Sequence, residues 1–225
     1  MTLGSPKPTN ATKINQMTSR PNFFPGLLFA ALGLLTTGGC NLLPQAQSDP
    51  TRFYVLSTPA AAAAFGAEAK APAIHLRPVE LASYIKAKPM IVRRGDNEIE
   101  FREYARWGEP LELGIGRVLR EELLVRGAAG AVLAAGLRAF NVDYDYELTV
   151  RVLACEGQTD GSVKFRAVWE LSTTGATPKV AARGDFSPTG LKWDTKNEST
   201  LASQLSEAVS GLAADVATGL TKAKG

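Results

Sequence analysis

The chain of 225 residues is 45% hydrophobic and 21% charged, with a formal net charge of +3 at pH 7. Three basic residues near the N-terminus, Lys7, Lys13 and Arg20, account for all of this excess, so the rest of the chain is neutral. A neutral domain gives no electrostatic basis for binding nucleic acid, and no such partner is expected. The one histidine and two cysteines do not stand at the spacing of zinc ligands.

Residues 1–39 have the three parts of a secretory signal: a basic region, an apolar core and small residues at the end. The apolar core, residues 23–35, is shorter than the about 20 residues that a membrane-spanning helix needs. The small residues directly before Cys40 resemble the lipobox of bacterial lipoproteins, although Thr37 stands where leucine is usual. We therefore expect cleavage before Cys40 and lipidation of that cysteine. A plain signal peptide with an incidental cysteine is the alternative.

The mature chain is expected to begin with a short tether. Residues 40–51 are rich in proline, glutamine and serine, which favours a flexible link to a folded domain of residues 52–225. With the anchoring cysteine acylated, Cys155 has no partner for an intramolecular disulfide, and we expect it to be a partly buried, small apolar residue. A start of translation at Met17 instead of Met1 would shorten the leader and leave the tether and the domain unchanged.

The first half of the domain combines short strands with one helix. The segment 94–97 contains Gly, Asp and Asn, which tolerate the backbone of a tight turn and predict a hairpin. An apolar stripe predicts a helix from Leu113 to Arg126, which Gly127 ends. The Ala-rich segment 57–72 is expected to be a loop. Strands are expected at 52–56, 74–81, 90–93 and 98–101.

The second half has clearer periodicity. Residues 144–154 and 163–171 alternate between apolar and polar side chains, as antiparallel strands covered on one side do. A shorter strand is expected at 180–186. A helix starting at Asn197 carries apolar residues every three or four positions along one face: Leu201, Leu205, Val209, Leu212, Val216 and Leu220. The sequence therefore predicts a single α+β domain, a twisted antiparallel sheet with two helices packed on one face.

No catalytic arrangement is recognisable in the sequence. His75 lies inside an expected strand and is interpreted as structural, and Gly114-Ile115-Gly116 lacks the third glycine of a dinucleotide turn. The carboxylates of the expected strands alternate with apolar residues, which is typical of a solvated face. We expect a protein that is not an enzyme and that needs no cofactor and no metal.

Several segments of the mature chain together form a pattern shared with one known family. They are Arg52-Phe53-Tyr54-Val55-Leu56, Pro78-Val79-Glu80-Leu81-Ala82-Ser83-Tyr84-Ile85, Pro89-Met90-Ile91-Val92, Asn97-Glu98-Ile99 and Tyr104-Ala105-Arg106-Trp107-Gly108-Glu109-Pro110-Leu111. These segments resemble those of the PqiC-type lipoproteins. The similarity covers the chain from about residue 40 to its C-terminus and is strongest between 74 and 126. Ala82 departs from the family pattern, which usually has proline there.

The resemblance implies a function in transport. PqiC-type proteins are auxiliary lipoprotein subunits of Pqi-type systems, which carry lipids or other hydrophobic molecules between the inner and outer membranes. The implied partners are an MCE-domain transport subunit, through it an integral inner-membrane subunit, and the outer membrane. Asn41 fits retention at the outer membrane, facing the periplasm, because Asp at this place is the usual signal for the inner membrane. By analogy with ring-forming MCE proteins, a homo-oligomeric ring is a further expectation.

Partner-binding candidates lie around the Arg-Trp segment. Tryptophan and arginine are frequent anchors of protein interfaces. The alternative interpretation is structural: Trp107 packs over the sheet edge and Arg106 pairs with Glu109 or a neighbour. Trp193 is a weaker candidate. The candidate partner-binding residues are Tyr84, Arg106, Trp107, Glu109 and Pro110.

Two other functions are compatible with the same sequence. One is a periplasmic lipid-binding carrier with an apolar pocket of its own. The other is an envelope scaffold lipoprotein unrelated to transport. A carrier should retain lipid after its acylated cysteine is removed, whereas a docking subunit should not.

Overall fold

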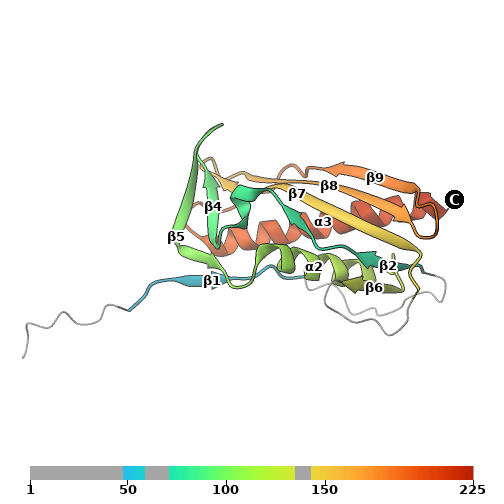
Figure 1. Cartoon of the computed structure of the whole chain (residues 1–225). Helices are drawn as coiled ribbons and strands as arrows, with labels where there is room; N and C mark the ends of the chain where they lie inside the picture. The colour runs from blue at the N-terminus through green and yellow to red at the C-terminus, as the bar shows by residue number, and fades with distance from the viewer. Residues whose placement is uncertain (1–47, 59–70, 135–142, 225) are drawn as a thin grey trace, which may run out of the picture. The chain divides into compact units, whose positions relative to one another are not determined.

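The computed structural model describes residues 48–58, 71–134 and 143–224 (Figure 1). Cys40 and most of the expected tether lie outside the described residues. A compact unit spans Pro50–Gly225. The fold below is that of the described part of this unit.

Within the described residues, nine strands form one mixed sheet. Its main path runs β1-β5-β4-β7-β2-β6, and β8 and β9 continue from the other edge of β7. The strands are β1 (Arg52–Tyr54), β2 (Ala73–Leu76), β3 (Glu80–Leu81), β4 (Pro89–Arg93), β5 (Ile99–Trp107), β6 (Ala131–Ala134), β7 (Tyr146–Gln158), β8 (Val163–Thr173) and β9 (Val180–Phe186).

The long strand β7 organises the sheet. The short strands β2, β3 and β4 pair with it in parallel, one after another, at its start, its middle and its end. On its other edge β8 pairs antiparallel along almost the whole length of β7, and β9 continues antiparallel to β8. At one end of the sheet β5 pairs antiparallel with β4 and parallel with β1, and at the other end β6 pairs parallel with β2.

Two helices, α2 (Leu111–Val125) and α3 (Glu198–Lys224), cover one face of this sheet (Figure 1). The apolar stripe predicted for α3 is fully buried, from Leu201 to Leu220. The apolar face that alternates along β7 and β8 is buried too, with Leu148, Val150, Phe165 and others at the centre of the core. Burial of this shared apolar surface is the main stabilising contribution to the domain.

A polar contact joins the two helices where α2 ends. Glu122 interrupts the apolar stripe of α2, yet its side chain is buried. It pairs with Arg126 at 2.9 Å, and Arg126 also donates to the Ser210 hydroxyl of α3 at 2.9 Å. The buried carboxylate is therefore compensated by a positive charge, as burial of a charged group requires.

The predicted single α+β domain with two helices on one face is confirmed, but the sheet is mixed and not wholly antiparallel. The strand expected at 74–81 is broken, because Pro78 has no N–H for a ladder and the residues around it separate β2 from β3. The strand expected at 98–101 extends to Trp107 as β5. The strand at Ala131–Ala134 was not predicted, since its four small and apolar residues show no alternation.

A short irregularity in β7 places two chemically active side chains in the interior. The register with β8 shifts between Val152 and Ala154, and Cys155 and Glu156 are then both buried. Burial, and next the negative charge of Glu156, raises the pKa of the Cys155 thiol to about 12. Cys155 is thus more deeply buried than the partial burial expected of it, and it is a free cysteine.

Cys155 should therefore resist thiol reagents in the folded protein. A pKa raised from 9.0 to about 12 lowers the thiolate fraction at pH 8 by roughly a thousandfold, and the thiolate is the nucleophile. Titration with a chromogenic disulfide is expected to detect no reactive thiol in the native acylated protein and one thiol after unfolding in urea. Rapid reaction of the native protein would show that Cys155 is accessible.

Candidate functional site

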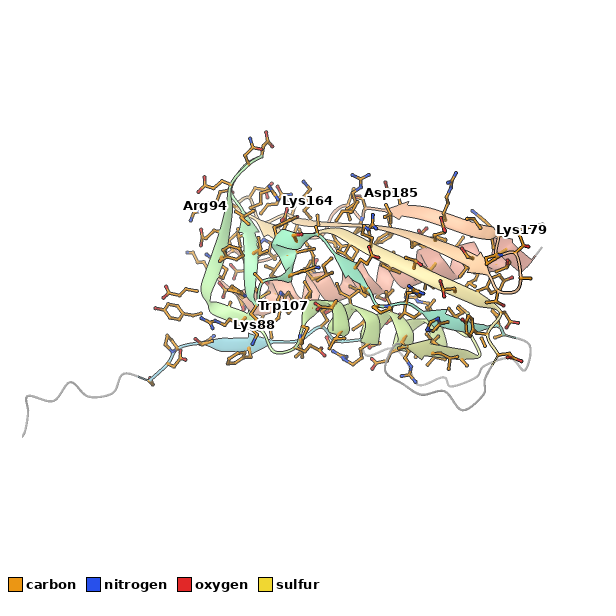
Figure 2. All side chains as sticks on the ribbon, in the orientation of Figure 1. Lys88, Arg94, Trp107, Lys164, Lys179 and Asp185 are labelled. Atoms are coloured by element: carbon orange, nitrogen blue, oxygen red, sulfur yellow. The ribbon has the colours of Figure 1, made fainter. Side chains whose placement is uncertain are left out.

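The Arg-Trp segment lies where β1, β4 and β5 meet, just before α2. Trp107 is only 6% exposed, and its backbone N–H donates to the Lys88 carbonyl at 2.8 Å. The next residue, Gly108, donates its N–H to the Tyr54 carbonyl at 2.8 Å. Figure 2 labels Trp107 and Lys88 side by side at this end of the sheet. The Trp107 side chain therefore packs into the core, and the backbone of Trp107 and Gly108 joins the end of β5 to β1 and to the residue before β4.

Glu109 has a structural role at the start of α2. Its carboxylate accepts a hydrogen bond from Arg117 at 2.6 Å, and Arg117 also donates to the Leu56 carbonyl at 2.8 Å. Glu109 therefore ties the first turn of α2 to the chain that follows β1. The alternative interpretation gave Arg106 either Glu109 or a neighbour as its partner, and Arg106 donates to the carbonyl of a neighbour, Glu103, at 3.5 Å.

Tyr84 belongs to a separate internal network. It lies in the short helix η2 (Ser83–Lys86), where its hydroxyl donates to the Leu153 carbonyl at 3.3 Å. The guanidinium of Arg93 lies 5.7 Å from the centre of the Tyr84 ring, and Arg93 binds the buried Glu156 at 2.5 Å. Burial, and next the charge of Glu156, raises the pKa of Tyr84 to about 12. Tyr84 thus keeps its proton and contributes to a buried polar cluster.

Trp193 is buried as well. Its indole N–H donates to the Gln158 carbonyl at 3.2 Å, and the Arg102 guanidinium lies 5.9 Å from its ring. The ring also occupies the space next to Gly157, where a side chain would meet it at 2.7 Å. Trp193 is therefore a packing residue at the end of β7. Of the candidates, only Arg106 and Pro110 present exposed side chains, and their binding to a partner stays a prediction.

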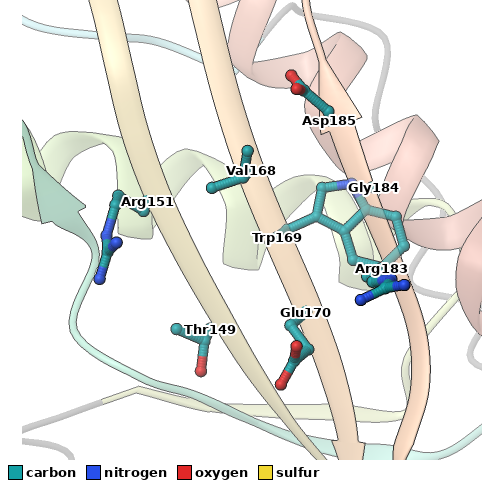
Figure 3. Close-up of a pocket in the computed structure, with 8 residues that line it drawn as sticks. All are labelled: Thr149, Arg151, Val168, Trp169, Glu170, Arg183, Gly184 and Asp185. Atoms are coloured by element: carbon teal, nitrogen blue, oxygen red, sulfur yellow. The ribbon is translucent and has the colours of Figure 1, made fainter.

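A hollow of about 520 Å³ lies on the face of β7, β8 and β9 that the helices do not cover (Figure 3). Its charged side chains come from three strands and carry both signs. The Trp169 ring passes beneath Gly184, and its indole N–H donates to Asp215 of α3 at 2.8 Å. The lining consists of Thr149, Arg151, Val168, Trp169, Glu170, Arg183, Gly184 and Asp185. Such a mixed, shallow surface is typical of the solvated face of a sheet.

Several carboxylates on the strands are engaged in ion pairs with arginines. Asp185 binds Arg166 at 2.6 Å, and the guanidinium holds the pKa of that carboxyl below its usual range. Glu80 binds Arg151 at 2.8 Å. His75 lies 3.4 Å from Glu147, consistent with its interpretation as a structural residue. In the described part of the chain, no group of three His, Cys, Asp or Glu side chains could hold a metal ion.

Sequence reasoning missed an exposed apolar face on β1. Phe53 is 67% exposed and Val55, just after the strand, is 54% exposed. Phe53 lies directly opposite Arg106 of β5 in the parallel register. The sequence does indicate this face, because residues 53–56 are apolar at both odd and even positions. A core on one side of the strand can cover only one of these two sets. We refer to Phe53, Val55 and Arg106 as the β1 face.

Comparison with known proteins identifies the family. The model of the ABC-type transport auxiliary lipoprotein component matches residues 54–217. The chain belongs to this family. The resemblance to PqiC-type lipoproteins is thereby confirmed, and with it a role as a transport-associated lipoprotein of the cell envelope.

Solved structures of low sequence identity share the fold of this chain. One is a crystal structure of an uncharacterized protein, 16% identical, with a TM-score of 0.57 over 75% of this chain and 97% of the other. Another is protein XCC0632 from Xanthomonas campestris, 15% identical, with a TM-score of 0.55 over 77% of this chain and 93% of the other. No curated protein matches the chain. No helix among the described residues is both long and apolar enough to span a membrane.

Proposed function

We propose that this family member is the outer-membrane lipoprotein subunit of a Pqi/MCE-type system for intermembrane lipid transport. In this role it faces the periplasm, is not an enzyme, and docks or organises the transport conduit at the outer membrane. The observation that carries the proposal is the family match over residues 54–217, joined to the lipobox-like sequence that ends at Cys40. The proposed partner is the MCE-domain subunit, and through it the integral inner-membrane subunit.

The lipid anchor would supply most of the membrane affinity. One acyl chain gives only marginal attachment, at about 0.8 kcal/mol per buried CH₂ group, whereas two or more give stable anchoring. The segment between Cys40 and β1 would then keep the domain at a high effective concentration for any partner near the membrane. Modest contacts with the conduit are sufficient for docking under these conditions.

The described surface supports a binding role more than a chemical one. Several of its strand carboxylates are ion-paired, its tyrosine candidate keeps its proton, and its cysteine is buried. These paired and buried side chains stabilise the domain, and the exposed strand faces and loops are left for contacts with a partner.

We extend the proposal to a homo-oligomeric ring, by analogy with ring-forming MCE proteins. Mass measurement of the purified protein at high concentration is expected to give an oligomer, and a monomer alone would count against the ring.

One observation favours the second candidate function, a lipid carrier. A hollow of about 280 Å³ lies beside α2, with an apolar floor and three arginines at its rim. This volume is slightly below the roughly 300–1,000 Å³ of typical small-molecule sites. Its lining includes Leu76, Val79, Leu113, Arg77, Arg117 and Arg120. Arg77 and Arg117 are already paired with Glu147 and Glu109, so the docking role has the stronger support.

The test is affinity purification of the tagged protein from detergent-solubilised envelopes. We expect an MCE-domain subunit to be recovered with it and no bound lipid in the Cys40→Ala protein. Recovery of the bait without any MCE-domain protein would contradict the docking role. Phospholipid bound to the Cys40→Ala protein in a fixed ratio would favour the carrier.

A further inference from the structure

The β1 face is an apolar surface that the fold itself leaves uncovered. Phe53 and Val55 point to the same side of the chain, because they alternate with Tyr54 and the buried Leu56. Gly108 lies against both, since a side chain there would meet Val55 at 3.3 Å and Phe53 at 3.8 Å. Single exposed apolar residues are normal on proteins, whereas two on the same side of one short segment form a patch.

The position of this patch in the chain is informative. It begins one residue into β1, immediately after the segment that links the domain to the proposed lipid anchor. About a dozen residues separate Cys40 from β1, and a chain of this length reaches at most about 40 Å. A domain of this size has a radius of gyration of about 16 Å. The anchor therefore holds the β1 face within reach of the bilayer surface.

Basic side chains adjoin the apolar ones. Arg106 lies opposite Phe53, and the exposed Lys88 precedes β4, whose first residue pairs with Arg106. Figure 2 places the label of Lys88 at the same end of the sheet as Trp107 and β1. Aromatic and aliphatic side chains beside basic ones suit the boundary between acyl chains and phosphate headgroups.

We propose that the β1 face rests on the phospholipid surface of the membrane that holds the anchor, and thereby orients the domain. The proposal rests on the proposed lipidation of Cys40. It assigns Arg106 to phospholipid headgroups instead of to a protein partner. Because the tether raises the effective concentration of the membrane, two half-exposed apolar side chains are enough to bias the orientation. The rest of the domain, including the β8–β9 hairpin at the far end of β7, then points toward the periplasm.

The experiment places a fluorescent probe beside the patch. Ser57 is exposed and close to Val55, and Cys155 is buried, so Ser57→Cys offers one reactive thiol in the acylated protein. The labelled protein is reconstituted into phosphatidylethanolamine–phosphatidylglycerol vesicles. We expect blue-shifted emission that spin-labelled lipids quench. The matched control, Thr177→Cys at an exposed position of the β8–β9 turn, should show neither effect.

Variants of the patch complete the test. Phe53→Ser with Val55→Ser is expected to reduce the docked population about tenfold, since the lost apolar burial is the driving force. Val180→Ser, at an equally exposed apolar residue of β9, should leave it unchanged. If the double variant unfolds, Arg106→Glu in anionic vesicles provides the second measurement and should also weaken quenching.

The outcomes separate this inference from the proposed function. Equal emission from the two probe positions in the acylated protein would overturn the inference and leave lipidation intact. Loss of MCE recovery in the double variant, with unchanged lipid quenching, would assign the β1 face to the protein partner and would also overturn it. Failure to obtain any acylated protein would contradict the proposed function itself.

Discussion

Replacing Glu156 by glutamine is expected to lower the free energy of unfolding by about 3–5 kcal/mol, the usual cost of breaking a buried ion pair. The Glu156 side chain is 0% exposed, and that of its partner Arg93 is only 17% exposed. Glutamine has nearly the same shape, so the substitution leaves the Arg93 charge buried without a counter-ion and opens no cavity. The pair joins the ends of β4 and β7, which are neighbouring parallel strands.

Urea unfolding followed by circular dichroism measures this change. The matched control is Asp185→Asn, which breaks an ion pair to Arg166 in which both side chains are about half exposed. Exposed pairs contribute little, so the control should unfold at nearly the same urea concentration as the wild type. Equal stability of the Glu156→Gln protein and the wild type would show that the buried pair does not hold the two strands.

Replacing Cys40 by alanine is expected to move the protein from the membrane fraction to the soluble periplasmic fraction. The reason is that acyl chains on this cysteine would supply nearly all of the membrane affinity, and the β1 face alone would supply only weak, reversible contact. Fractionation of cells after an alkaline wash, followed by immunodetection, measures the change.

Cys155→Ala is the matched control for this experiment, because it removes the other cysteine of the chain and should leave the protein on the membrane. If Cys40→Ala protein stays in the washed membrane fraction, the leader acts as a transmembrane anchor. That result would contradict lipidation as the means of attachment.

Elements with a complete apolar face were predictable from the sequence. The alternation in β7 and β8 and the stripe of α3 predicted their burial, because one side of each is covered along its full length. The parallel pairing of β2, β3 and β4 with β7 was not predictable. Each is a few residues long, and its position along β7 depends on contacts between residues far apart in the chain.

The candidate site was predictable only in part. The Arg-Trp segment identified the family, but a motif does not reveal which of its side chains point inward. Once β5 extends to Trp107, the alternation of a strand puts Trp107 in the core and Arg106 on the surface. Glu109 meets Arg117 because α2 begins at Leu111, two residues earlier than predicted.

We propose that the lipoprotein docks the transport conduit at the outer membrane. The most direct measurement is cross-linking in intact cells followed by separation of inner and outer membranes on a density gradient. We expect the MCE-domain subunit to appear in the outer-membrane band with the wild-type lipoprotein and to return to the inner-membrane band with Cys40→Ala. The same distribution of the MCE-domain subunit in both strains would contradict the account.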